Sequence, residues 1–137
     1  MRLTLFGTWM FALLWSGASL AQQGIEHRLV LNGLNGPVQA KLLYEALHGH
    51  PGFRAADTQL EEPGHALVWL AEERSFEELR GYLAPYGFEL IALLFRVEDG
   101  QQTRRADQGI DPSGTPYPSA LVAWLAMHPE YTDRSLP

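Results

Sequence analysis

The chain has 137 residues, carries a formal net charge of −6 with its histidines neutral, and contains no cysteine. An acidic surface repels phosphate backbones, so we expect no nucleic-acid partner. Without cysteine the chain forms no disulfide and does no thiol redox chemistry, and burial of apolar side chains must stabilise the fold.

The first 21 residues have the order of an export signal. An apolar stretch follows Arg2 and gives way to small residues that end at Ala21. We predict cleavage after Ala21, because Ser19 and Ala21 then occupy the two positions where signal peptidase accepts small side chains. An uncleaved membrane anchor is the alternative, since the uncharged stretch is long enough to cross a bilayer. We therefore expect an exported protein, periplasmic or secreted, with no stable membrane insertion after cleavage.

The exported part is expected to begin with a β-strand and an α-helix. Residues 27–32 are rich in aliphatic side chains and predict a strand. The helix begins at Gly36 and Pro37, because proline suits the first helical position. It ends at Gly49 and Pro51. Its buried face is predicted to consist of Val38, Leu42, Leu43, Ala46 and Leu47.

A hairpin, a second helix and a last strand are expected next. Residues 53–60 and 65–71 are the two strands of the hairpin, with a turn between them. Ser75 opens the helix as a capping box, in which the Ser75 hydroxyl and the Glu78 carboxylate each satisfy a free amide of the first turn. Residues 88–97 then predict an apolar strand.

This order of elements is the split βαβ pattern of a ferredoxin-like sandwich. The predicted fold class is α+β, in the βαββαβ arrangement, with a four-stranded antiparallel sheet that two helices cover on one face. We place this domain at residues 22–98.

Residues 99–137 are expected to form a polar linker, a short helix and a polar tail. Residues 99–118 are punctuated by glycine and proline and bury little apolar area. A helix after Pro118 would carry an apolar stripe. Its residues are Tyr117, Leu121, Trp124, Leu125 and His128.

A two-layer sandwich leaves the second face of its sheet uncovered. Alternation along residues 65–71 places Leu67 and Trp69 on one face and other apolar side chains on the opposite face. We predict that the C-terminal helix folds back near Leu67 and Trp69, because an intramolecular contact has a high effective concentration. Docking of this helix on another protein is the alternative.

The stretch Leu-Asn-Gly-Leu-Asn-Gly-Pro-Val-Gln, residues 31–39, resembles the metal loop of heavy-metal-associated domains. A Ser-Phe-Glu-Glu-Leu at the second helix and a Tyr-Gly-Phe-Glu after it are similar to the same family. The resemblance covers residues 27–91 and implies the ferredoxin-like fold. Gly36 and Gln39 stand at the two cysteine positions, so the thiolates that select Cu(I) are absent.

Three histidines are candidate metal ligands. His48 and His50 stand two residues apart, and both can reach one Zn²⁺ or Cu²⁺ ion. Two ligands are too few for a tight site unless His65 or a carboxylate joins them. Histidine is also favoured at a helix C-terminus by the helix dipole, without any metal.

No residue pattern predicts an enzyme. The paired glutamates lie at turns and helix starts, where they are expected to be solvated, and Ser75 is a cap with no neighbouring histidine. We therefore predict a non-enzymatic binding or adaptor module with no cofactor and with a protein partner. The alternative is a histidine-based Cu(II)- or Zn(II)-binding protein of the cell envelope. The candidate partner-binding residues are Leu34, Asn35, Gly36, Trp69, Tyr117 and Trp124.

Overall fold

A computed structural model describes residues 24–61, 63–97, 111 and 113–135. The predicted signal peptide and most of the predicted linker lie outside these residues. Within them, no helix is both long enough and apolar enough to cross a membrane.

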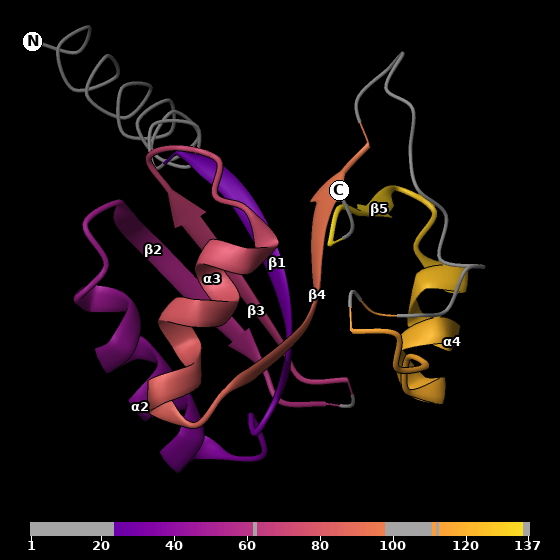
Figure 1. Cartoon of the computed structure of the whole chain (residues 1–137), viewed down its shortest axis with the longest axis horizontal. Helices are drawn as coiled ribbons and strands as arrows, with labels where there is room; N and C mark the ends of the chain where they lie inside the picture. The colour runs from indigo at the N-terminus through magenta and orange to yellow at the C-terminus, as the bar shows by residue number, and fades with distance from the viewer. Residues whose placement is uncertain (1–23, 62, 98–110, 112, 136–137) are drawn as a thin grey trace, which may run out of the picture.

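The described chain is an α+β fold with a five-stranded antiparallel sheet and three α-helices (Figure 1). The strand order is β2-β3-β1-β4-β5. The strands are β1 (Ile25–Asn32), β2 (Phe53–Gln59), β3 (His65–Leu70), β4 (Glu89–Arg96) and β5 (Tyr131–Asp133). The helices are α2 (Pro37–His48), α3 (Phe76–Leu83), α4 (Ser119–Met127) and the short 3-10 helix η1 (Ala84–Tyr86).

Helices α2 and α3 cover one face of the sheet, which we call the aliphatic face (Figure 1). Its core is built mainly from leucines of both helices and of β1, β3 and β4, together with Phe76, Phe88 and Phe95. These side chains are almost completely buried. Burial of apolar area is therefore the main stabilising contribution on this face.

The predicted buried face of α2 is wrong in part. Val38 and Leu42 are 67% and 47% exposed, whereas Ala40 is buried with the other three predicted positions. Residues four apart advance about 40° around a helix at each step, so a stripe through 38, 42 and 46 spirals away from the sheet. Alternating steps of three and four keep one face, and this places Ala40, Leu43 and Leu47 on the core.

The predicted cap of α3 is confirmed on one side. The backbone N–H of Glu78 donates to Ser75 Oγ at 3.2 Å. The Glu78 carboxylate does not return the bond, because it accepts from Arg74 at 3.4 Å instead. Ser75 alone therefore supplies the side-chain cap of this helix.

The C-terminal region folds back on the second face of the sheet, as predicted, although mainly over β1 and β4, with Trp124 reaching His65 of β3. Leu121 and Leu125 of α4 pack with Val30, Ala92 and Leu94 of β1 and β4. The prediction placed α4 near Leu67 and Trp69 of β3 instead. We call this second surface the mixed face, because its core also holds polar side chains.

The predicted polar tail and the predicted count of four strands are both wrong. Tyr131–Asp133 forms β5 and pairs antiparallel with Leu94–Arg96 of β4. A strand of three residues is too short to show the alternation by which a strand is recognised. Residues 131–133 are extended because they pair with β4, and their own sequence does not predict a strand.

Candidate functional site

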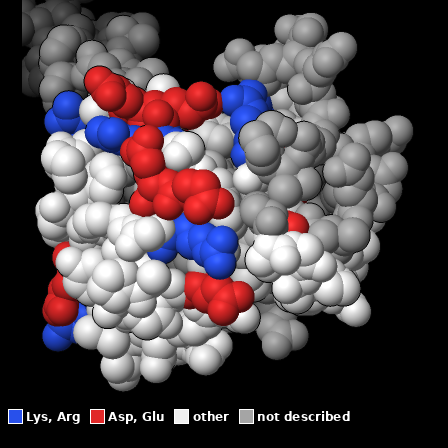
Figure 2. All heavy atoms as spheres, in the orientation of Figure 1, with Lys and Arg blue, Asp and Glu red and all other residues white. Residues whose placement is uncertain are grey.

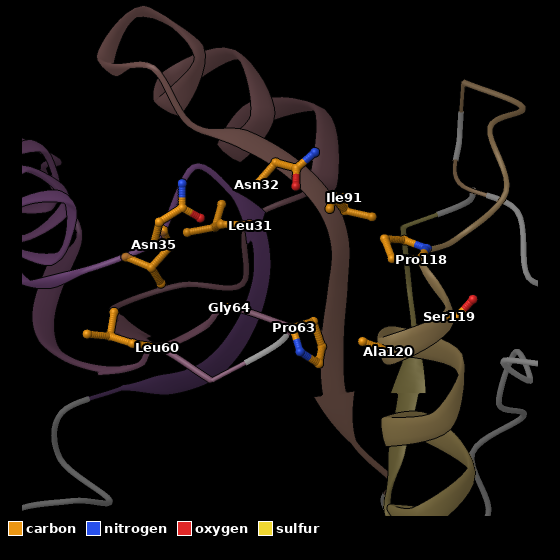
Figure 3. Close-up of a pocket in the computed structure, with 11 residues that line it drawn as sticks. Leu31, Asn32, Asn35, Leu60, Pro63, Gly64, Ile91, Pro118, Ser119 and Ala120 are labelled. Atoms are coloured by element: carbon orange, nitrogen blue, oxygen red, sulfur yellow. The ribbon is translucent and has the colours of Figure 1, made fainter.

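The candidate site is a pocket of about 510 Å³ where three segments meet (Figure 3). The end of β1 and the loop before α2 form one wall, the β2–β3 turn forms the second, and the start of α4 with Ile91 forms the third. Its lining residues are Leu31, Asn32, Leu34, Asn35, Leu60, Pro63, Gly64, Ile91, Pro118, Ser119 and Ala120.

Two glycines fold the loop and the turn against each other. Gly33 has φ +98°, a conformation that L side chains rarely adopt, and it turns the chain out of β1. A β-carbon at Gly64 would lie only 3.0 Å from the Leu34 carbonyl oxygen. The Leu31 N–H also donates to the Gly64 carbonyl at 3.0 Å. This close backbone approach positions two of the three walls.

Among the described residues, the lining of the pocket carries no charged side chain. Leucine, isoleucine and proline supply its apolar surface, and Asn32, Asn35 and Ser119 supply polar groups. The first backbone N–H groups of α4, at Ser119 and Ala120, have no acceptor within the helix. Such a surface suits an uncharged ligand that has an apolar part and hydrogen-bonding groups.

Gly36 and Gln39, the positions predicted to correspond to metal-binding cysteines, lie beside this pocket. Gly36 is extended, with φ −175° and ψ −177°, and caps α2 without a side chain. A β-carbon at Gly36 would lie 3.4 Å from Gln39 Oε1, so side chains at these two positions meet. Glycine has no donor atom and glutamine offers an amide, so this pair supplies no soft ligand for Cu(I).

The three candidate metal ligands do not converge. His48 Nδ1 donates to the Tyr44 carbonyl at 2.6 Å, whereas His50 Nδ1 accepts from the Gly52 N–H at 3.1 Å. His65 is buried under Trp124 of α4, on the other face of the sheet from α2. In the described part of the chain, no three histidine, aspartate or glutamate side chains are placed to hold a metal ion.

The predicted partner-binding residues divide into exposed and buried ones. Asn35 is exposed and Gly36 is half-buried. Trp69 and Trp124, on β3 and α4, are also half-buried. Leu34 and Tyr117 are buried, at 3% and 7% exposed. The pKa of Tyr117 is raised, mainly by burial. The second cause is the hydrogen bond that the Tyr117 hydroxyl donates to the carboxylate of Asp133.

The glutamates near α3 are solvated, as predicted. Glu72, Glu73 and Glu78 are exposed and pair with arginines: Arg74 contacts Glu72 and Glu78, and Arg134 contacts Glu73. Acidic and basic side chains therefore adjoin one another on this side of the molecule (Figure 2). Such ion pairs on the surface contribute little to stability.

A buried polar cluster that no sequence pattern predicted lies under α4. Arg28 of β1 is 7% exposed and donates to the Tyr131 hydroxyl at 3.1 Å and to His65 Nδ1 at 3.2 Å. Its guanidinium carbon lies 5.0 Å from the ring centroid of Trp124 and 4.7 Å from that of Tyr131. We call Arg28, His65, Trp124 and Tyr131 the latch cluster. A charged residue inside an apolar strand was its one sequence signal.

The latch cluster lowers the pKa of His65. Burial is the largest cause, the positive charge of Arg28 the second and His128 the third, and together they bring this pKa to about 4. The imidazole of His65 is therefore neutral at pH 7.

Comparison of the chain with protein-family models, with curated proteins and with solved structures finds no match. The candidate site is therefore described from its own geometry.

Proposed function

We propose that this chain is an exported, non-enzymatic binding module in which the pocket beside residues 32–36 takes the place of a metal site. The observation that carries the proposal is the pocket itself. It is built on the loop that resembles a metal loop, yet those of its lining residues that the structure describes include no charged side chain and no sulfur. Leu34 and Asn35, two of the predicted partner-binding residues, form part of its wall.

The arrangement of the elements supports a ferredoxin-like sandwich as the finer description of the fold. Strands β2, β3, β1 and β4 follow one another in the antiparallel sheet, and α2 and α3 cover a single face. A split βαβ pair produces this order. In this reading α4 and β5 are additions that cover the second face and complete the pocket.

The proposed ligand is an uncharged peptide segment of a protein partner that inserts one apolar side chain. A volume of about 510 Å³ exceeds what one leucine fills, so neighbouring backbone atoms enter as well. Asn32, Asn35 and the free N–H groups at the start of α4 would pair with the amides of the segment. A charged side chain would lose its hydration in the pocket without gaining a counter-charge.

The test is an NMR titration with two pentapeptides that are acetylated and amidated at their ends. One has a central leucine and the other a central glutamate. We expect the leucine peptide to shift the backbone amides of Asn32, Asn35 and Ser119, and the glutamate peptide to bind at least about tenfold more weakly. Shifts that avoid all three amides would contradict the proposal.

A pair of matched variants on α4 sharpens this test. Ala120→Phe fills the pocket from its α4 wall and should abolish the shifts. Ala126→Phe adds the same ring at an exposed position of the same helix and should leave them unchanged. If Ala120→Phe binds the leucine peptide as well as the unchanged protein does, the pocket is not the binding site.

A further inference from the structure

The latch cluster joins the C-terminal region to the sheet through one buried histidine. His65 is 1% exposed, and side chains from two other elements contact its ring. Arg28 of β1 donates to its Nδ1, and Trp124 of α4 meets its ring edge-on with centroids 4.6 Å apart. Tyr131 of β5 accepts from the same guanidinium, so one arginine connects His65 to β5.

These contacts allow only one neutral form of His65. Arginine has donors and no acceptor, so Nδ1 must offer its lone pair to Arg28, and the ring hydrogen resides on Nε2. Among the described residues Nε2 has no hydrogen-bond partner. The second nitrogen therefore gains nothing from a hydrogen bond, and the Arg28 contact fixes the tautomer.

Protonation of His65 would break the cluster. A hydrogen on Nδ1 would face the N–H of Arg28 at a nitrogen–nitrogen distance of 3.2 Å, and two buried cations would adjoin. His128, stacked on Trp124 with centroids 3.9 Å apart, is a third basic group. Within the described residues, no carboxylate forms an ion pair with Arg28 to compensate.

We propose that the latch cluster is an acid-sensitive device that holds α4 and β5 on the sheet and releases them when His65 takes up a proton. Release would uncover the apolar mixed face around Val30 and Leu94. It would also remove the pocket wall at Pro118, Ser119 and Ala120. Only this second consequence rests on the proposed function, because the latch itself depends on contacts within the chain.

Linkage gives the expected size of the effect. In the closed state, burial opposes the protonation of His65, and so do the charges of Arg28 and His128. An opened His65 regains its ordinary pKa and binds one more proton than the closed one between pH 6.5 and about 4. The opening constant should then rise about tenfold for each pH unit by which the pH falls in this interval.

Amide hydrogen exchange followed by mass spectrometry measures this opening in the unchanged protein. After correction for the intrinsic pH dependence of exchange, peptides from α4 and β5 should show an opening constant that rises about fortyfold from pH 6.5 to 4.5. Peptides from α2 and α3 exchange through complete unfolding and should have a smaller opening constant than α4 and β5 at each pH. An opening constant of α4 that never exceeds that of α2 and α3, or no rise in α4, would overturn the proposal.

Two variants assign the effect to His65. His65→Gln keeps an oxygen acceptor for Arg28 and cannot be protonated, so the exchange of α4 should lose its pH dependence. His27→Gln is the matched control, because His27 is equally buried but faces the aliphatic side, where it accepts from the Arg74 N–H and contacts Phe95. Its α4 peptides should keep the wild-type pH dependence. A wild-type slope in His65→Gln would refute the latch, and if that variant does not fold, the measurement on the unchanged protein decides.

A repeat of the leucine-peptide titration at pH 6.5 and 4.5 separates the two proposals. Normal binding at pH 6.5 that is lost at pH 4.5 supports both. Failure of binding at both values with intact pH-dependent opening would refute the pocket and leave the latch standing. Binding that is equal at both values while α4 opens would show that α4 does not complete the pocket.

Discussion

The two faces of the sheet are held by different kinds of interaction. On the aliphatic face, α2 and α3 pack leucine and phenylalanine side chains against β1, β3 and β4. On the mixed face, α4 and β5 combine aliphatic contacts with a buried arginine, a buried histidine and two aromatic rings. Burial of apolar side chains involves no protonation, whereas a buried neutral imidazole beside a cation can take up a proton as the pH falls. The mixed face is therefore expected to be the more sensitive of the two to acid, although the aliphatic side also holds a buried histidine, His27.

The largest effect is expected on the aliphatic face. Leu43→Ala removes a completely buried side chain from its centre and should lower the free energy of unfolding by about 2–5 kcal/mol. Because no titratable group is changed, the loss should be the same at pH 7 and pH 5. Urea unfolding at the two pH values measures it. A loss that depends strongly on pH would show that the packing of the aliphatic face is coupled to protonation.

Trp124→Ala is the corresponding truncation on the mixed face. The ring is half-buried and contacts His65, His128 and Tyr131, so we expect a loss of about 3 kcal/mol at pH 7, the lower end of the range for a buried tryptophan. The variant also exposes His65 and lets its pKa rise toward 6.5. The difference from wild type should therefore shrink at pH 4.5. An equal difference at both pH values would contradict the role of Trp124 in shielding His65.

The pH dependence of the unchanged protein follows from the same cluster. The unfolded chain protonates His65 near pH 6.5, whereas the folded chain does so near pH 4. Stability should therefore be constant above pH 7 and should fall as the pH drops from 6.5 to 4, by on the order of 3 kcal/mol. Burial also lowers the pKa of His27 and of His50, which acts in the same direction. Urea midpoints across this range, compared with His65→Gln, measure the share of His65.

Much of the structure of residues 24–97 could be predicted from local signals. The strands of the sheet were recognisable from aliphatic runs, α3 from its Ser75 cap and α2 from Pro37. The rotation of α2 about its axis could not be predicted, because it depends on which side of the helix meets the sheet. Two hydrogen bonds accompany this rotation: the Tyr44 hydroxyl donates to the Ala56 carbonyl of β2, and the Tyr82 hydroxyl donates to the Ala46 carbonyl. These contacts join residues that are distant in sequence.

The candidate sites show the same limit. Leu34 and Asn35 were predicted from the loop that contains them, but the other walls of the pocket come from residues 60–64 and 118–120. The latch cluster joins Arg28 to residues 37 and 103 positions further along the chain. Such sites exist only once the C-terminal region has folded back. An arginine in a strand otherwise suggests a solvent-exposed position.

The smallest effect is expected from the two histidines at the end of α2. His48 is exposed and bonds to the Tyr44 carbonyl of its own helix, and the ring of His50 packs edge-on against Tyr82 with centroids 4.9 Å apart. His50 also accepts from the Gly52 N–H in the turn that follows. Exchange of both histidines for glutamine should cost about 1 kcal/mol in total, because each local bond at a helix end contributes a fraction of that. Thermal unfolding with and without added Zn²⁺ measures this. A loss of several kcal/mol, or a zinc-dependent gain in melting temperature that the variant abolishes, would favour histidine-based metal binding instead. His65→Gln serves as the control, since the loss of His65 should change the pH dependence of stability and leave the response to zinc unaltered.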